Sequence, residues 1–230
     1  MLLHLFASFP HLLIGAIIAL LILVNSNDSF KEKLFLVVFT CFVVISPDIL
    51  KIMGILFGHS LWLAPILGLT FALLYSIKNK NIKITKSWFV FTLVILFGHI
   101  FIDYIGNGVR LFYPFVREEF EFSLIMKLNF FIILFLVLSL VFVFFNKKSK
   151  SIGIASLSVL LLLFSILTVS KIHLEHSLNE EYKSEGINMV ITYPNDNFGW
   201  GFQVRTEKTI ITGESSINTT NIQVQTKREN

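Results

Sequence analysis

Residues 97–115, FGHIFIDYIGNGVRLFYPF, contain the feature that decides the fold: an apolar run with a histidine and an aspartate that ends in a glycine-containing turn. Ionisable side chains at membrane depth are costly, so they are usually paired or functional. His99 and Asp103 are one helical turn apart, about 40° around the helix axis, so both can address one point. The stretch therefore predicts the end of a membrane helix that carries part of a polar site.

The composition of the whole chain agrees with a membrane protein. Of its 230 residues, 54% are hydrophobic and 25 are Phe, and the mean hydropathy is +0.75. This exceeds what a soluble core could bury and predicts several membrane spans. The net charge of +4 does not indicate a nucleic-acid partner, because the lysines lie in short loops between apolar segments. The single cysteine, Cys41, excludes a disulfide framework and a cysteine-type zinc site.

Windows of about 20 apolar residues predict six membrane spans. They cover residues 6–25, 34–50, 61–77, 88–105, 124–145 and 152–171. Short cytoplasmic loops collect Lys and Arg. The first, third and fifth loops hold nine lysines, whereas the second and fourth hold four basic residues. Both termini are therefore predicted to be extracytoplasmic, and the first span, which lacks a basic leader and a cleavage site, is predicted to be a retained helix.

The chain becomes polar after Lys171, which predicts a separate soluble segment. A juxtamembrane helix, KIHLEHSLNEEYKSEG, precedes four alternating strings that predict strands. These strings are NMVITY, WGFQVRT, KTIIT and NIQVQT, with PNDNFG and GESS as turns. The predicted fold class is an all-α multispanning membrane protein with a small C-terminal β-rich segment. Residues 1–172 form the transmembrane helical domain, and residues 173–230 form an extracytoplasmic juxtamembrane helix and β unit.

Histidines and aspartates gather at one end of the predicted helices. Those at the outer ends are His4, His11, Asp48, His59, His99 and Asp103. Imidazole and carboxylate ligands at helical spacing suit zinc or another divalent metal. The alternative is a structural clasp of hydrogen bonds. His4 is interpreted as interfacial because it is near a terminus, and His173 and His176 as part of a solvated, charge-rich helix.

Four short motifs resemble, in order, those of the YdjM-like bacterial membrane-bound metal-dependent hydrolases. They are HLLIGA from His11, SPDI at 46–49, GHSL at 58–61 and GHIFIDYIGNGVRLFYPF from Gly98. In that family they are an early His, PDxD, HRGxTHS, and HxxxD followed by a glycine and LxxP. The resemblance, over about the first 115 residues, implies a metal site and a location in a bacterial cell membrane, either a single cell membrane or an inner membrane. The implied ligands are His11, Asp48, His59, His99 and Asp103.

The chain departs from the family pattern at several positions. Leu50 replaces the second aspartate of PDxD, and Lys51 follows it where a His is frequent. Gly54 opens the stretch that replaces HRG, and Gly106 stands where a Thr is usual. A two-metal site would lose at least two ligands, so the residues favour a single metal, with a non-catalytic descendant as the other reading.

The chemistry that follows from such a site is hydrolysis, because a bound divalent metal activates water and polarises an ester. Asp48 or Asp103 would be the general base, and Arg110 would meet an anionic group of the substrate, unless it is a snorkelling anchor. A membrane lipid is the expected partner, with a phospholipid phosphoester preferred by analogy to helical zinc phospholipases. The alternative is an inactive membrane scaffold or stress-response protein whose outer tail recruits a partner; a transporter is a weaker third option.

Overall fold

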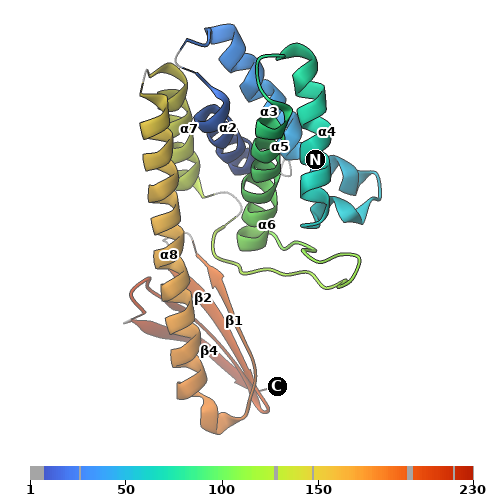
Figure 1. Ribbon diagram of the computed structural model, residues 1–230. Helices are drawn as coiled ribbons and strands as arrows, with labels where there is room; N and C mark the ends of the chain where they lie inside the picture. Colours follow the sequence, from blue (N-terminus) through green and yellow to red (C-terminus); the bar gives the residue numbers. More distant parts are fainter. Residues whose placement is uncertain are drawn as a thin grey trace. The chain divides into compact units, whose positions relative to one another are not determined.

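The computed structural model describes residues 8–25, 27–126, 129–146, 148–195, 199–219 and 221–229. The chain divides into two compact units (Figure 1). The first comprises residues 1–122 and 127–158, and the second comprises residues 123–126 and 159–230. All the clustered histidines and aspartates discussed below belong to the first unit, and the sheet belongs to the second.

The first unit is helical. Its elements are α2 (Phe9–Leu23), α3 (Phe30–Ile52), the 3-10 helix η1 (Leu56–His59), α4 (Leu63–Lys78), α5 (Ile84–Leu93), the π-helix η2 (Val94–Ile100), α6 (Phe101–Gly106), α7 (Phe130–Phe145) and the start of α8 (Ser149–Glu181). The elements α5, η2 and α6 follow one another without a break, so they form one helical rod of 23 residues.

Each of the six predicted apolar segments contains a helix, and three of these helices have the length and composition of a membrane span. They are Phe30–Ile52, Ile84–Gly106 and Ser149–Glu181, of 23, 23 and 33 residues. The other three, α2, α4 and α7, are apolar but have only 15 or 16 residues. The chain is thus mostly helical, with three candidate spans among its described residues.

Two predicted boundaries were wrong. The fifth segment was predicted from residue 124, but α7 begins at Phe130, because the Asn129 side chain accepts a hydrogen bond from the Ile132 amide and caps the helix there. The sixth was predicted to end at 171, with a separate juxtamembrane helix after it. Instead α8 runs unbroken to Glu181, since nothing between 171 and 181 is a glycine or proline that would stop it.

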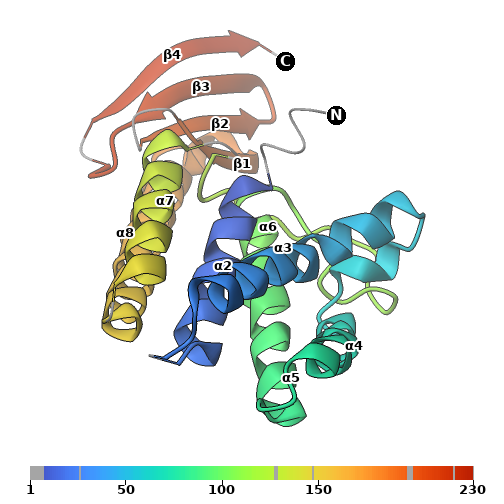
Figure 2. The same cartoon turned by 90° about the horizontal axis from the view of Figure 1, so that it is seen from above.

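Helix α2 is the centre of the first unit. Figure 2 shows it between α7 on one side and α3 and α6 on the other, and 11 of its 15 residues are buried. It approaches η2 closely at two glycines: a Cβ atom on Gly98 would lie 3.1 Å from the Gly15 Cα atom. Small residues permit such backbone contact between membrane helices. This contact brings His11 and His99 together, with ring centroids 5.0 Å apart.

The second unit contains a four-stranded antiparallel sheet in the order β1-β2-β3-β4. The strands are β1 (Ile187–Pro194), β2 (Trp200–Thr206), β3 (Thr209–Ser215) and β4 (Ile222–Glu229). All four predicted strands are present. The predicted GESS turn was wrong in part, because Gly213–Ser215 pair with β2 and the turn falls at Ser216–Thr219. The other predicted turn, PNDNFG, includes residues 196–198, which lie outside the described residues.

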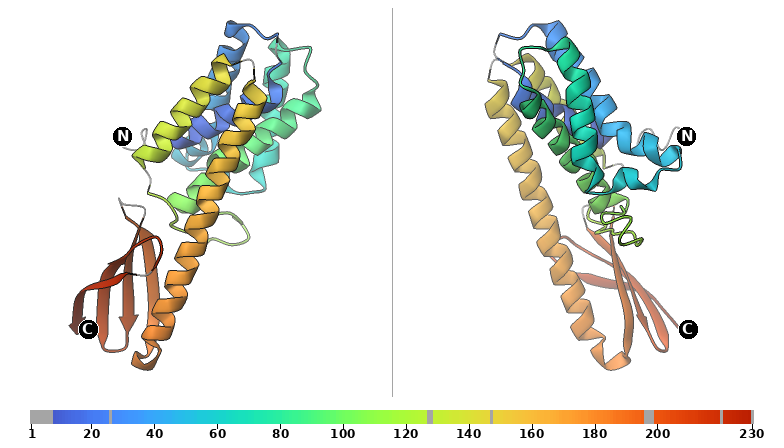
Figure 3. Two further views of the ribbon diagram at one scale, coloured as in Figure 1. Left: turned by 90° about the vertical axis from the view of Figure 1, so that its left-hand side faces the viewer. Right: turned by 45° about the vertical axis from the view of Figure 1, so that its right-hand side comes forward.

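The C-terminal half of α8 packs along one face of this sheet (Figure 3). Trp200 and Phe202 are fully buried, and the Trp200 indole donates a hydrogen bond to the Ser170 hydroxyl at 2.8 Å. The buried Lys171 ammonium donates to the Thr192 carbonyl at 2.9 Å. The sheet and the part of α8 from Ser170 onward therefore pack against each other within the second unit.

Candidate metal centre

Five elements of the first unit each deliver one side chain to a common point. His11 comes from α2, Asp48 from the last turns of α3, His59 from the end of η1, His99 from η2 and Asp103 from α6. Pro47 precedes Asp48 inside α3, and the chain then turns so that His59 faces back toward it. All five residues that the sequence proposed as metal ligands are thus brought together, whereas His4 lies outside the described residues.

Several of the ligand atoms lie within hydrogen-bonding distance of a neighbouring ligand atom. Asp103 is at the centre: its Oδ1 is 3.0 Å from His11 Nε2, and its Oδ2 is 3.4 Å from His59 Nε2 and 3.3 Å from His99 Nε2. Asp48 Oδ1 is 3.2 Å from His59 Nε2. One ligand atom from each of Asp48, His59, His99 and Asp103 lies within 4.8 Å of the other three. Such a spacing fits the coordination sphere of one metal ion.

The donor set suits a cation better than it suits hydrogen bonds alone. The Nε2 atoms of His59 and His99 face each other at 3.2 Å, and each also faces a carboxylate oxygen. A ring nitrogen carries at most one proton, so it cannot serve both contacts. The Nδ1 atoms of His11, His59 and His99 have no hydrogen-bond partner within the described part of the chain. The polar contacts of all three rings therefore lie on the Nε2 side, at the centre of the cluster.

Burial gives the cluster its electrostatic character. The side chains of His11, His59 and His99 are nearly inaccessible, Asp103 is 10% exposed and Asp48 is 33% exposed. Two carboxylates in such a place need compensating positive charge. Burial lowers the pKa of His59, but its hydrogen bonds with Asp103 and Asp48 outweigh this effect, so the pKa is raised above the ordinary 6.5. The site thus attracts a proton or a metal ion at its more exposed, Asp48 side.

The π-helix η2 and a following asparagine position the central carboxylate. A π-turn widens the helix locally and is frequent at functional sites; here it includes His99 and directly precedes the helix that carries Asp103. Asn107 donates from Nδ2 to Asp103 Oδ1 at 2.8 Å. Asn107 was not among the site residues predicted from the sequence, although its i+4 spacing from Asp103 is a usable signal.

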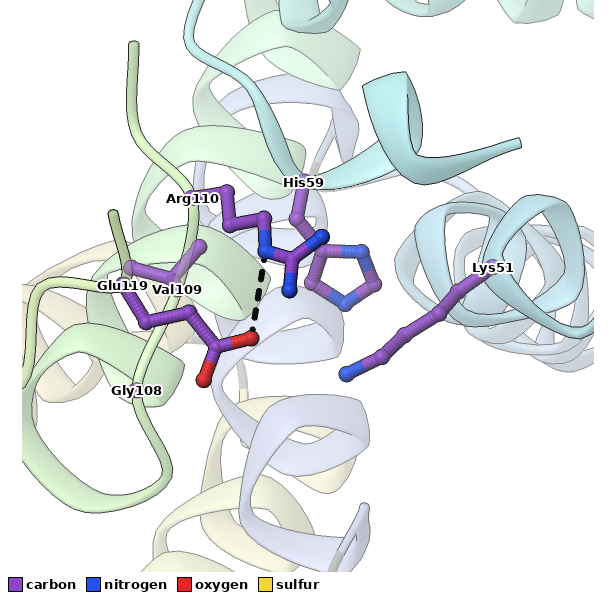
Figure 4. A pocket seen from close by; sticks show the side chains of 6 residues that line it. All are labelled: Lys51, His59, Gly108, Val109, Arg110 and Glu119. Carbon is purple, nitrogen blue, oxygen red and sulfur yellow. Dashed lines mark ion pairs between the residues drawn. The ribbon is translucent and has the colours of Figure 1, made fainter. Parts of the chain in front are cut away.

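Arg110 lies outside the cluster but lines a small pocket beside it (Figure 4). The pocket is formed by Lys51, His59, Gly108, Val109, Arg110 and Glu119. Arg110 Nε is 3.2 Å from Glu119 Oε1, an ion pair without the alignment of a hydrogen bond. A short backbone pairing of Val109 with Phe120 closes the loop that carries both residues. His59 belongs to both the pocket and the cluster, so the pocket borders the cluster at this residue.

Comparison with known proteins identifies one family. The sequence model of the YdjM inner membrane protein family matches residues 7–173, a stretch that includes all five clustered side chains. No curated protein and no solved structure matches the chain. The family that the four motifs indicated is therefore confirmed over most of the chain.

Proposed function

The chain belongs to the YdjM inner membrane protein family, and we propose that it is a membrane hydrolase whose His/Asp cluster holds one divalent metal ion. The observation that carries this proposal is the convergence of five His and Asp side chains, from five separate elements, on one partly accessible point. We place the protein in a bacterial inner membrane.

The ligands in this proposal are Asp48, His59, His99 and Asp103, whose donor atoms share one small volume. His11 completes the set, because its Nε2 faces the same Asp103 carboxylate. Zinc is the preferred ion, since mixed imidazole and carboxylate ligands are typical of its sites. A bound divalent metal supplies an activated water and a polarised ester oxygen.

The two aspartates have different roles in this proposal, one mainly as a metal ligand and the other also as the general base. Asp103 is held by three imidazoles and Asn107, so its oxygens are engaged and it serves as a ligand. Asp48 is the more exposed carboxylate, and its Oδ1 contacts His59, which also lines the pocket. We therefore assign to Asp48 the acceptance of the water proton as general base, a role for which the sequence left both residues open.

The substrate in this proposal is a membrane-associated ester, with a phospholipid phosphoester as the preferred example. Six spans with both termini outside the cytoplasm would put the cluster at outer interfacial depth, where a lipid headgroup lies. Arg110 would meet an anionic group of that substrate with its planar fork of donors. The segment from residue 173 onward would then be extracytoplasmic.

Hydrolysis itself is tested with the purified full chain in phospholipid nanodiscs. We expect release of products from phospholipid or p-nitrophenyl esters that needs added zinc. Asp48→Asn should lower kcat by about 100-fold or more, because it removes the base, while retaining the fold. Equal activity in Asp48→Asn, or activity that survives chelation, would contradict the assignment.

A second function, a scaffold or stress-response protein without catalysis, is favoured by two observations. Leu50 and the missing HRG remove residues that the family pattern contains, and the sheet forms with α8 a second compact unit, separate from the cluster. Under this alternative, deletion of residues 188–230 abolishes the cellular phenotype, and His99→Ala affects stability alone. Under the hydrolase proposal, His99→Ala abolishes the phenotype as well.

A further inference from the structure

We infer that Lys51 and Arg110 form a two-sided subsite that binds a phosphate group next to His59. The inference deepens the proposed function and rests on it for the identity of the neighbouring metal centre. It assigns a role to Lys51, which stands where the family pattern frequently has a His and which no motif explains. The bound chemistry is a tetrahedral oxyanion, either in a lipid headgroup or as free phosphate.

The geometry begins with the two cations. Both line the pocket that includes His59, and Figure 4 shows their side chains entering it from two sides, with the Lys51 ammonium directed toward its centre. A lysine in the last turn of a helix often interacts with the terminal carbonyls instead. The Lys51 side chain is directed into the pocket and makes no ion pair in the described parts of the chain.

The charge balance of the pocket leaves one positive charge to be matched. Glu119 pairs with Arg110 through Nε, so the terminal nitrogens of the guanidinium keep their donors for a ligand. Lys51 adds a second positive charge that no carboxylate of the described pocket residues neutralises. The Arg110 guanidinium and the Lys51 ammonium lie on opposite sides of this small pocket. Such a pair of cationic donors suits a phosphate better than a neutral ester.

The position of the subsite connects it to the metal centre. His59 contributes its ring to the pocket and its Nε2 to the cluster, and Asp48, the more exposed ligand, lies three residues before Lys51. A phosphoester whose charged oxygens meet Lys51 and Arg110 would therefore have its phosphorus beside the cluster. This selects phosphoesters over carboxylic esters as the substrate class.

The test measures binding rather than turnover. Inorganic phosphate is titrated calorimetrically into zinc-loaded full-length protein in an uncharged detergent, and phosphatidate in the same detergent is the second probe. The variants are Lys51→Ala, Arg110→Ala and the conservative Lys51→Arg. The matched controls are Lys80→Ala and Arg117→Ala, which change exposed basic residues outside the pocket. Metal content is determined on every sample.

We expect each pocket alanine variant to weaken phosphate binding by about tenfold or more, because charged hydrogen bonds are lost. Lys51→Arg should stay within about threefold of the wild type, since it retains the charge, and the controls and metal contents should not change. Competition between phosphatidate and phosphate would identify a lipid headgroup as the source. Phosphate binding without competition would identify a free anion, and both results uphold the subsite.

The subsite is overturned if wild-type protein binds neither probe, or if the controls weaken binding as much as the pocket variants. It is also overturned if Lys51→Ala and Arg110→Ala bind like the wild type. Failure of the proposed function has a different signature: the wild type then holds no metal. In that case, titration of the metal-free protein still decides the subsite through the same comparison of variants.

Discussion

At the scale of single residues, Asp103 is the centre of the site, and its surroundings explain why a carboxylate stands in an apolar helix. Three imidazole nitrogens lie within 3.4 Å of its oxygens, and Asn107 holds one of them. A buried carboxylate with several donors is stabilised only when its partners stay in place. Residues that orient Asp103 should therefore affect metal binding without being ligands.

Asn107 provides the test of this point. Asn107→Ala removes the hydrogen bond to Asp103 Oδ1, and we expect zinc affinity to fall by about 10-fold to 100-fold, the usual effect of an outer-shell partner. Competition with a chromophoric chelator measures it. The matched control is Asn129→Ala, which removes the cap of α7 and should lower stability at unchanged zinc affinity. Unchanged affinity in Asn107→Ala would show that Asp103 needs no such support.

The five candidate ligands could be proposed from the sequence, but the neighbouring residues that contact them or line the adjoining pocket could not. His11, Asp48, His59, His99 and Asp103 were recognisable because ionisable residues stand out in apolar helices. Asn107 and Lys51 were not, because a polar residue at or just after a helix end has many ordinary roles. Which side-chain atoms come into contact depends on the distances between the helices, and short sequence motifs carry no information about those distances.

At the scale of elements, the site depends on how closely α2 approaches η2. The two glycines at their crossing allow backbone contact, and this contact places His11 beside Asp103. A side chain at this crossing would meet backbone atoms of Gly15, which cannot move aside alone as a flexible side chain can. The packing of one helix pair thus controls the metal centre.

Gly98→Val tests this dependence. We expect it to destabilise the protein by about 1–3 kcal/mol, the usual cost of overpacking, and to weaken zinc binding because α2 shifts away with His11. Thermal unfolding with and without zinc measures both effects. Gly153→Ala is the control, since its new methyl group would meet the Leu21 side chain, which can move. If Gly98→Val bound zinc with wild-type affinity, metal binding would not depend on the close packing of α2 against η2.

The elements themselves were largely predictable. Each of the six apolar windows overlaps a helix, and each of the four alternating strings overlaps a strand of the described chain. The errors concerned the ends of helices. Helix α7 begins later than predicted because Asn129 caps it. Helix α8 continues ten residues beyond its predicted apolar end, at 171, because the residues that follow also favour a helix. The π-helix was not predictable either, because its sequence, VILFGHI, is equally compatible with an α-helix.

At the scale of the whole molecule, the chain combines a helical unit that contains the site with a second unit built on a sheet. Both the family and three long apolar helices indicate a membrane protein. The distribution of lysines among the loops predicts the orientation, with residues 173–230 outside the cytoplasm.

Thiol labelling tests the orientation. In a Cys41→Ser background, Asn218→Cys lies in the turn before β4 and Lys80→Cys in the loop between α4 and α5. We expect a membrane-impermeant maleimide to label the first in intact spheroplasts, and the second after the membrane is permeabilised. The reverse pattern would put residues 173–230 in the cytoplasm and contradict the predicted topology.

The most direct measurement of the central claim is elemental analysis of the purified full-length protein. We expect about one zinc or other divalent ion per chain in the wild type. We also expect loss of this ion in His99→Ala and its retention in His173→Ala, a histidine of the second unit that contacts Thr219. A wild-type protein without stoichiometric metal, or His99→Ala with the wild-type content, would contradict the central claim.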